Sequence, residues 1–110
     1  MSGSPEKTRL QFLREAVQNS PDDPFTRYAL ALELAKTAPT EAWSHFEYLL
    51  DRHPEYSATY QQAGVFLLNR GRREEAQKVL VKGVEVTGRQ GNKHAQSELQ
   101  AALDELTTEL

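Results

Sequence analysis

The sequence of 110 residues contains no cysteine. A disulfide framework, a thiolate metal site and a cysteine nucleophile are therefore excluded, and a reducing compartment, the cytoplasm, is expected. The sequence also lacks a long hydrophobic run, because no apolar stretch approaches the ~18 residues of a membrane-spanning helix. The opening MSGSPEKTR has no apolar core, so we expect no secretory signal there.

Neither sign of charge dominates. Thirteen basic residues are scattered among sixteen acidic ones, which leaves a formal net charge of −3. Nucleic-acid-binding proteins normally carry a stronger basic patch, so neither a nucleic acid nor a membrane is expected as partner. A chain of this length fits one domain, residues 1–110, and buries roughly two-thirds of its unfolded surface, enough to fold without disulfides or metals.

Residues that could carry chemistry are few and form no catalytic or metal-binding pattern. No two of the histidines His45, His53 and His94 are spaced four apart, and no cysteine completes a ligand set. Glu41 precedes His45 by one helical turn, and we expect that pair to make only a surface contact. No glycine follows a predicted strand, as a phosphate-binding loop requires. The sequence therefore predicts no enzyme, no metal and no cofactor.

The apolar periodicity predicts helices only, because no stretch alternates with the period of a strand. Polar residues suited to N-caps precede four of them, and proline and glycine separate them. The expected caps are Ser4, Asp23, Thr40 and Ser57, and Gly71 is expected to end the fourth helix in a left-handed conformation. The predicted helices span residues 5–19, 24–36, 41–52, 58–70, 73–87 and 92–108.

Two helix pairs repeat one another. Three residues recur 34 positions on, namely Ala42 as Ala76, Phe46 as Leu80 and Pro54 as Gly88. Four more recur 33 positions on, namely Arg27 as Tyr60, Leu30 as Ala63, Ala31 as Gly64 and Leu34 as Leu67. The difference of one residue falls in the turn between the two helices. Two helices in a 34-residue period are typical of one class of helical repeat.

The second unit resembles the tetratricopeptide repeat motif W-x2-L-G-x2-Y…A-x3-F…P, whereas the first departs from it at Arg27, where the motif has tryptophan. The resemblance implies an all-α fold, an antiparallel stack of helix-turn-helix repeats. It divides the chain into a half repeat at 5–19, repeats at 24–56 and 57–90, and a capping helix at 92–108. The last helix, His94 to Leu106, is also similar to that of small bacterial proteins of this family.

Small residues mark where two helices of a repeat would approach closely. Gly64 weakens its helix by about 1 kcal/mol relative to alanine, and close packing against Ala76 is expected to offset that cost. Ala31 and Ala42 are expected to play the same parts in the first repeat. The single tryptophan, Trp43, is expected to be largely covered, with its rim reachable by water.

The resemblance implies that the first helix of each repeat lines a concave groove that holds a peptide or a partner's helix. Within residues 24–36, Leu30 and Leu34 point into the stack and a second apolar stripe faces away. The family's carboxylate clamp is expected to be absent, because Tyr28 and Leu32 occupy slots where it has Lys and Asn. An amphipathic helix or an extended apolar peptide is then the expected ligand. The residues expected to bind it are Phe25, Tyr28, Leu32, Lys36, Gln61, Gln62, Val65 and Asn69.

Other occupants of this face stay open. The terminal helix or the N-terminal segment could cover it, or the chain could associate with a second copy through the same face. The terminal helix, with its apolar stripe from Ala95 to Leu106, discriminates between these alternatives. Exchanged between chains it would make a homodimer, whereas docked on the helix at 73–87 it would cap the stack and leave the groove to another polypeptide.

Overall fold

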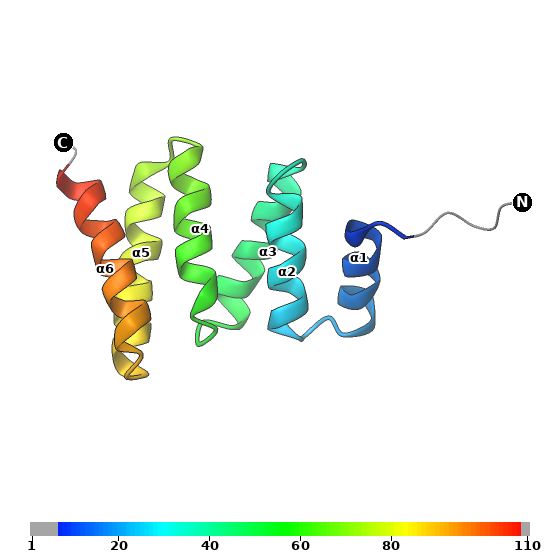
Figure 1. The fold of residues 1–110 in the computed structure, drawn as a ribbon, viewed down its shortest axis with the longest axis horizontal. Coiled ribbons are helices and arrows are strands. Elements are labelled where there is room, and N and C mark those ends of the chain that lie inside the picture. The colour runs from blue at the N-terminus through cyan, green and yellow to red at the C-terminus, as the bar shows by residue number, and fades with distance from the viewer. Residues whose placement is uncertain (1–6, 109–110) are drawn as a thin grey trace, which may run out of the picture. The chain divides into compact units, whose positions relative to one another are not determined.

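The computed structural model describes residues 7–108, and all regular structure in that range is helical. The helices are α1 (Arg9–Asn19), α2 (Pro24–Leu34), α3 (Pro39–Arg52), α4 (Ala58–Asn69), α5 (Arg73–Arg89) and α6 (Lys93–Thr108) (Figure 1). The prediction of an all-α fold is confirmed. The chain divides into two compact units, Met1–Leu49 and Leu50–Leu110, with the boundary inside α3.

Helix α1 begins later than predicted. Thr8 is its N-cap, where the Thr8 hydroxyl accepts a hydrogen bond from the Gln11 amide (3.1 Å) and the Gln11 side chain accepts one from the Thr8 amide (2.9 Å). This reciprocal capping box satisfies two backbone donors and begins the helix at Arg9. The predicted start at Ser4 and Pro5 lies outside the described residues. Residues 7 and 8 are not helical, so a continuous helix over 5–19 is wrong.

The starts of α2 and α4 agree with the prediction in position. The Asp23 carboxylate accepts a hydrogen bond from the Phe25 amide at 3.2 Å, and Pro24 is the first helical residue. Ser57 precedes α4, but its side chain makes no capping hydrogen bond. Its own backbone is helical (φ −67°, ψ −25°), whereas a capping serine normally adopts an extended conformation.

The boundary between α2 and α3 differs from the prediction. Helix α2 ends at Leu34 rather than Lys36, and a turn over residues 35–37 follows. Helix α3 begins at Pro39, so Thr40 lies inside the first turn and is not the cap. Proline suits this first position, because its missing N–H is one of those that a helix start leaves unpaired.

Left-handed glycines end α4 and α5. Gly71 has φ 74°, and the Arg72 amide donates to the Leu67 carbonyl at 2.9 Å, which confirms the predicted end of α4 and forms part of a Schellman cap. Gly91 has φ 70° and serves α5 in the same way. Because this glycine lies further on, α5 continues to Arg89, past its predicted end at residue 87.

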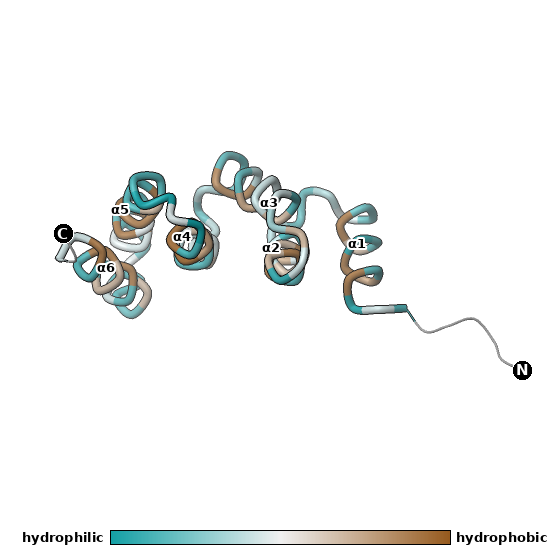
Figure 2. The backbone as a smooth tube through the Cα atoms, turned by 90° about the horizontal axis from the view of Figure 1, so that it is seen from above, coloured by the Kyte–Doolittle hydropathy of each residue, from teal (hydrophilic) through white to brown (hydrophobic). Residues whose placement is uncertain are grey.

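In the first unit, the consecutive helices α1, α2 and α3 alternate in direction (Figure 1). The hydrophobic side of α1 is turned toward α2 and its hydrophilic side away from it (Figure 2). Trp43 is half-buried, as expected, and its ring centre lies 6.5 Å from that of Phe46. The buried apolar residues of this unit are Leu13, Leu30, Ala31, Leu34, Ala42, Phe46 and Leu49.

In the second unit, α4, α5 and α6 also alternate in direction, and α5 packs against both of the others (Figure 1). Every apolar position that the repeat pattern assigns to the inside of α4 and α5 is buried. The buried apolar residues are Tyr60, Ala63, Phe66, Leu67, Ala76, Leu80, Val86, Leu99 and Leu106.

Two glycines mark close approaches between α4 and α5. A Cβ atom added at Gly64 would lie 2.7 Å from the end of the Leu80 side chain, so the nearest neighbour is Leu80 rather than the predicted Ala76. The second close approach was not predicted. A Cβ atom at Gly83 would lie 2.6 Å from the Cβ atom of Tyr60, next to the backbone of α4. Both glycines therefore exclude a side chain for a steric reason.

Candidate functional site

The predicted stripe on α2 occupies one face of that helix. Phe25, Tyr28 and Leu32 are spaced by three and four residues, which places them on the same side. Phe25 exposes 64% of its surface, while Tyr28 and Leu32 are half-buried. Leu30 and Leu34, on the opposite side, are buried in the core. Helix α2 thus presents an apolar face with an exposed aromatic ring near its N-terminus.

The far end of this face is basic. Lys36 is exposed in the turn after α2, and its ammonium lies 3.4 Å from one carboxylate oxygen of Glu33. The same oxygen lies 3.2 Å from the Arg9 guanidinium of α1. Two cations share one carboxylate, so this end of the α2 face retains positive charge.

The second predicted group lies on α4. Val65 exposes 43% of its surface, and Gln61 and Gln62, one turn earlier, are half-buried. Asn69 is exposed and is the last residue of α4. This face offers one apolar side chain bordered by amides, which can both donate and accept hydrogen bonds.

The eight predicted residues therefore form two groups of four. Phe25, Tyr28, Leu32 and Lys36 belong to the first unit, and Gln61, Gln62, Val65 and Asn69 to the second. The helical spacing brings Phe25, Tyr28 and Leu32 onto one face of α2, with Lys36 in the turn beyond it, and brings the second group onto one face of α4. The aromatic and basic character lies in the first group and the amide character in the second.

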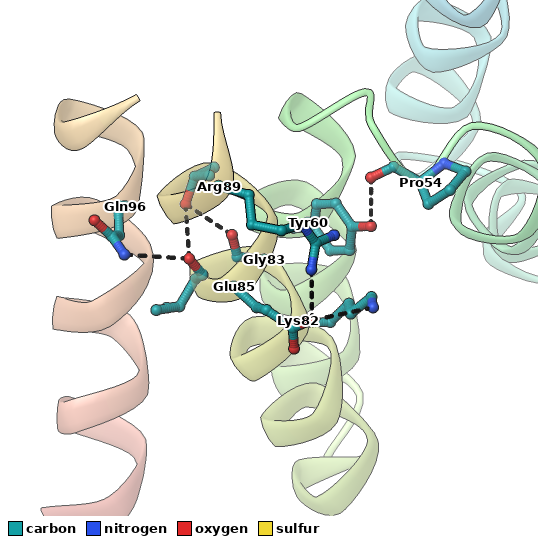
Figure 3. Close-up of polar contacts among 9 residues, drawn as sticks. Pro54, Tyr60, Lys82, Gly83, Glu85, Arg89 and Gln96 are labelled. Carbon is teal, nitrogen blue, oxygen red and sulfur yellow. Dashed lines mark hydrogen bonds and ion pairs between the residues drawn. The ribbon is translucent and has the colours of Figure 1, made fainter. Parts of the chain in front are cut away.

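The terminal helix docks on α5 of its own chain. Leu99 and Leu106 are 2% and 6% exposed, and the Arg73 guanidinium donates to the Leu106 carbonyl at 3.0 Å. The side-chain amide of Gln96 on α6 donates to the Val84 carbonyl of α5 at 3.3 Å, a contact drawn in Figure 3. The apolar stripe of α6 is used within the second unit, where Val65 stays exposed.

A polar cluster behind the α2 face was missed by sequence reasoning. Arg27 approaches the Nδ1 atom of His45 at 3.1 Å, and His45 is half-buried. The prediction that His45 makes only a surface contact with Glu41 is therefore wrong. Glu41 instead accepts hydrogen bonds from both terminal nitrogens of Arg14 on α1. The sequence did offer a signal, because Arg27 stands where the repeat motif has tryptophan, and a charged residue there requires polar partners nearby.

The Arg14–Glu41 pair joins α1 to α3. The hydrogen bond from the Arg14 guanidinium holds the pKa of the Glu41 carboxyl below its usual value, against a smaller opposing effect of desolvation. Both side chains remain more than a third exposed. Solvent screening keeps such a pair a weak contributor to stability.

Two further apolar side chains are exposed outside the predicted faces. Phe12 on α1 exposes 66% of its surface and Val81 on α5 exposes 46%. Val81 lies in a shallow groove of its own helix among long charged side chains that include Lys78 and Lys82. Its exposure matches that of Val65, in a charged rather than amide-lined setting.

Residues 7–108 contain no cluster of three or more His, Cys, Asp or Glu side chains that could hold a metal ion. Among the same residues, no helix combines the length and the apolar character that crossing a membrane requires.

The chain is similar to solved structures of helical repeat proteins. It shares 36% identity with a tetratricopeptide repeat domain protein from Salinibacter ruber solved in solution, over 79% of this chain and 89% of that one, with a TM-score of 0.76. A crystal structure of a tetratricopeptide repeat domain protein from Salinibacter ruber matches at 36% identity over 77% and 97%, with a TM-score of 0.73.

A protein from Bordetella parapertussis shares the fold at 24% identity, over 94% of this chain and 91% of that one, with a TM-score of 0.79. No protein-family model and no curated protein matches the sequence. The identity to the Salinibacter ruber domain, together with the 34-residue period, shows that the chain belongs to the tetratricopeptide repeat family.

Proposed function

We propose that this chain is a non-catalytic interaction module that binds an amphipathic helical segment of another polypeptide through the outward face of α2. Tetratricopeptide repeat domains are protein-interaction modules in general, and the proposal adds the face and the kind of ligand. An extended apolar peptide is the second ligand that this face suits.

The carrying observation is the exposure of Phe25. A phenylalanine that exposes 64% of its surface, in line with the half-buried Tyr28 and Leu32, forms an apolar patch on a helix whose opposite side is already buried. Aromatic anchors dominate the energy of many protein interfaces. An amphipathic helix offers apolar side chains at the same three- and four-residue spacing.

The charges near the patch favour an orientation of the ligand. Arg9 and Lys36 share the single Glu33 carboxylate at the C-terminal end of α2, while Asp22 and Asp23 precede its N-terminus. An acidic residue of the ligand would gain from the basic end, and a basic residue from the acidic end. We therefore propose a ligand helix with an acidic residue at the end that meets Lys36 and a basic residue at the end that meets Asp22 and Asp23.

Self-association through the same face is the alternative. The docking of α6 on its own α5 argues against exchange of the terminal helix between chains, because the buried Leu99 and Leu106 would have to leave their sites. Light scattering of the full chain distinguishes self-association through the α2 face from binding of another polypeptide there. A concentration-dependent dimer that Phe25→Ala abolishes would favour self-association.

A peptide-display selection on the full chain tests the proposal. We expect enriched peptides to have apolar residues at helical spacing and to lose about thirtyfold or more in affinity on Phe25→Ala, since an interface hot spot contributes about 2 kcal/mol or more. The control is Val81→Ala, which removes an exposed apolar side chain on α5, outside the α2 face.

Equal weakening by Phe25→Ala and Val81→Ala would contradict the proposed face. Circular dichroism of each variant accompanies the binding measurement. A loss of helix in Phe25→Ala would show that this ring supports the fold, contrary to its exposure.

A further inference from the structure

Arg27 is held by three groups at the junction of α2 and α3. One terminal nitrogen lies 3.1 Å from His45 Nδ1, and the other donates to the Pro21 carbonyl at 2.8 Å. The guanidinium carbon lies 3.8 Å from the ring centre of Tyr48. The remaining nitrogen, Nε, is buried without a hydrogen-bond partner. The cation therefore depends on a small number of contacts.

The contact with His45 fixes the protonation state of that imidazole. A guanidinium carries only donors, so Nδ1 of His45 must accept, and the ring must be neutral with its proton on Nε2. A proton added to Nδ1 would turn the acceptor into a donor. It would also place a second positive charge 3.1 Å from Arg27, and both effects oppose the contact.

Few groups near His45 could compensate such a charge. Glu41, one turn earlier on α3, is the anion beside it, and Glu41 already accepts both hydrogen bonds from Arg14 of α1. Arg27 faces His45 from α2. His45 thus meets two cations and one carboxylate that is already paired, so a proton on it lacks a free partner.

We propose that His45 and Arg27 form an acid-sensitive joint, in which protonation of His45 releases Arg27 from its slot and loosens α2 from α3 in the first unit. The same helix carries Phe25, Tyr28 and Leu32, so acid also weakens ligand binding on that face. This second consequence rests on the proposed function; the joint itself does not.

The second unit lacks these groups at the equivalent positions. Tyr60 stands where the first unit has Arg27, and Val79 stands where it has His45. The phenol donates to the Pro54 carbonyl at 2.6 Å, a contact seen in Figure 3 that involves no imidazole. The second unit is therefore an internal control in the same molecule.

The direction of the pH effect follows from the environment of His45. Burial, and secondarily the charge of Arg27, lower the pKa of His45 below its ordinary 6.5. The unfolded chain then takes up a proton near pH 6.5 that the folded unit resists. The contribution of neutral His45 to the stability of the first unit is fully present above that pH. It decreases as the pH drops through that value and stops decreasing below the pKa of the folded state.

Amide hydrogen exchange of the full chain at about pH 7.5 and about pH 5.5, corrected for intrinsic exchange rates, tests the joint. This window lies above the ordinary glutamate pKa of 4.5, which keeps the carboxylates ionised. We expect α2 amides to lose about tenfold in protection in acid, since one proton changes the opening constant by at most about tenfold per pH unit. Amides of α4 should change little.

The variant His45→Gln keeps an acceptor for Arg27 but cannot be protonated, and should retain α2 protection at both pH values. His94→Gln is the matched control, because His94 is exposed beside Glu98, and it should behave like the parent. If His45→Gln fails to fold, Arg27→Tyr, which copies the second unit, replaces it and should show a smaller acid response, because the charge of Arg27 is removed while the burial of His45 remains. An equal response of α2 and α4 in the parent, or an unchanged response in His45→Gln, would overturn the joint.

Binding of a display-selected helical peptide at both pH values forms the second arm. Affinity should fall in acid for the parent, by at most about tenfold, and stay constant for His45→Gln. Failure to select any peptide that depends on Phe25 would count against the proposed function and leave the exchange result to decide the joint. Exchange that responds while affinity does not would overturn the link between them.

Discussion

The two repeats anchor their first helix to the preceding turn with different side chains. Arg27 in the first unit and Tyr60 in the second both donate to the carbonyl of a proline six residues upstream, at 2.8 Å to Pro21 and 2.6 Å to Pro54. Each bond ties the first helix of a repeat to the turn before it. The slot therefore requires a side chain long enough to reach that carbonyl, and either a guanidinium or a phenol meets the requirement.

The second helix of each repeat differs together with the residue at positions 27 and 60. Tyr60 is 2% exposed, and its Cβ atom lies where a side chain at Gly83 would begin. At the equivalent position, 34 residues earlier, the first unit carries Leu49, which has no exposed surface. The requirement for a small residue at position 83 is therefore set by its contact with Tyr60 and is not shared by the equivalent position of the first repeat. The following variants test this difference.

The largest effect is expected for Leu49→Ala. Deleting most of a fully buried leucine should lower the free energy of unfolding by about 2–5 kcal/mol, because the surrounding core does not collapse completely into the cavity. Urea unfolding followed by the fluorescence of Trp43, the single tryptophan, reports directly on the first unit. A loss below about 1 kcal/mol would show that Leu49 is not a core residue of that unit.

A smaller effect is expected for Gly83→Ala, with the opposite change in volume. The added methyl would lie 2.6 Å from the Tyr60 Cβ atom, which sits next to the backbone and cannot rotate away. We expect a loss of about 1–3 kcal/mol from overpacking, even though alanine normally favours a helix over glycine by about 1 kcal/mol. Urea unfolding followed by circular dichroism measures the change.

Gly64→Ala is the matched control for that variant. Its methyl would meet the end of the Leu80 side chain at 2.7 Å, which can move more easily than a Cβ atom. The loss at Gly64 should therefore be the smaller of the two. A larger loss at Gly64 than at Gly83 would contradict the assignment of Gly83 as the tighter crossing.

The smallest effect is expected for Tyr60→Phe. The ring and its packing remain, and only the hydrogen bond to the Pro54 carbonyl is lost, which should lower stability by about 0.5–1.5 kcal/mol. Tyr48→Phe is the comparison, because the Tyr48 hydroxyl donates to the exposed Asp22 at 3.1 Å, where water can replace it. If thermal melting shows equal shifts for the two variants, the anchoring role of the Tyr60 hydroxyl is refuted.

Much of the architecture was predictable because helical periodicity is a local signal. The starts of α2 and α4, the left-handed Gly71 and the half-buried Trp43 all follow from residue types within a few positions of one another. The start of α1 was misplaced because two polar residues competed as cap, and the reciprocal bond between Thr8 and Gln11 wins. Such competition is hard to judge from spacing alone.

The faces of α2 and α4 were also predictable, since a residue half a turn from the core stripe must point away from it. Phe25 and Val65 are exposed as that rule requires. Arg27 at the tryptophan position indicated that polar partners were needed, but their identity was not predictable, because His45 lies on another helix and nothing in the local pattern pairs the two. Whether these faces bind a ligand stays a prediction.

The sequence by itself determined the helical repeat, its period and the side of each helix that enters the core, because these depend on the spacing of apolar residues along the chain. Only the tertiary structure decided that Arg27 meets His45, that Gly64 meets Leu80 rather than Ala76, that Gly83 approaches Tyr60, and that α6 packs on α5. Those contacts join residues on different helices, and their distances depend on how the side chains of two surfaces pack together in three dimensions.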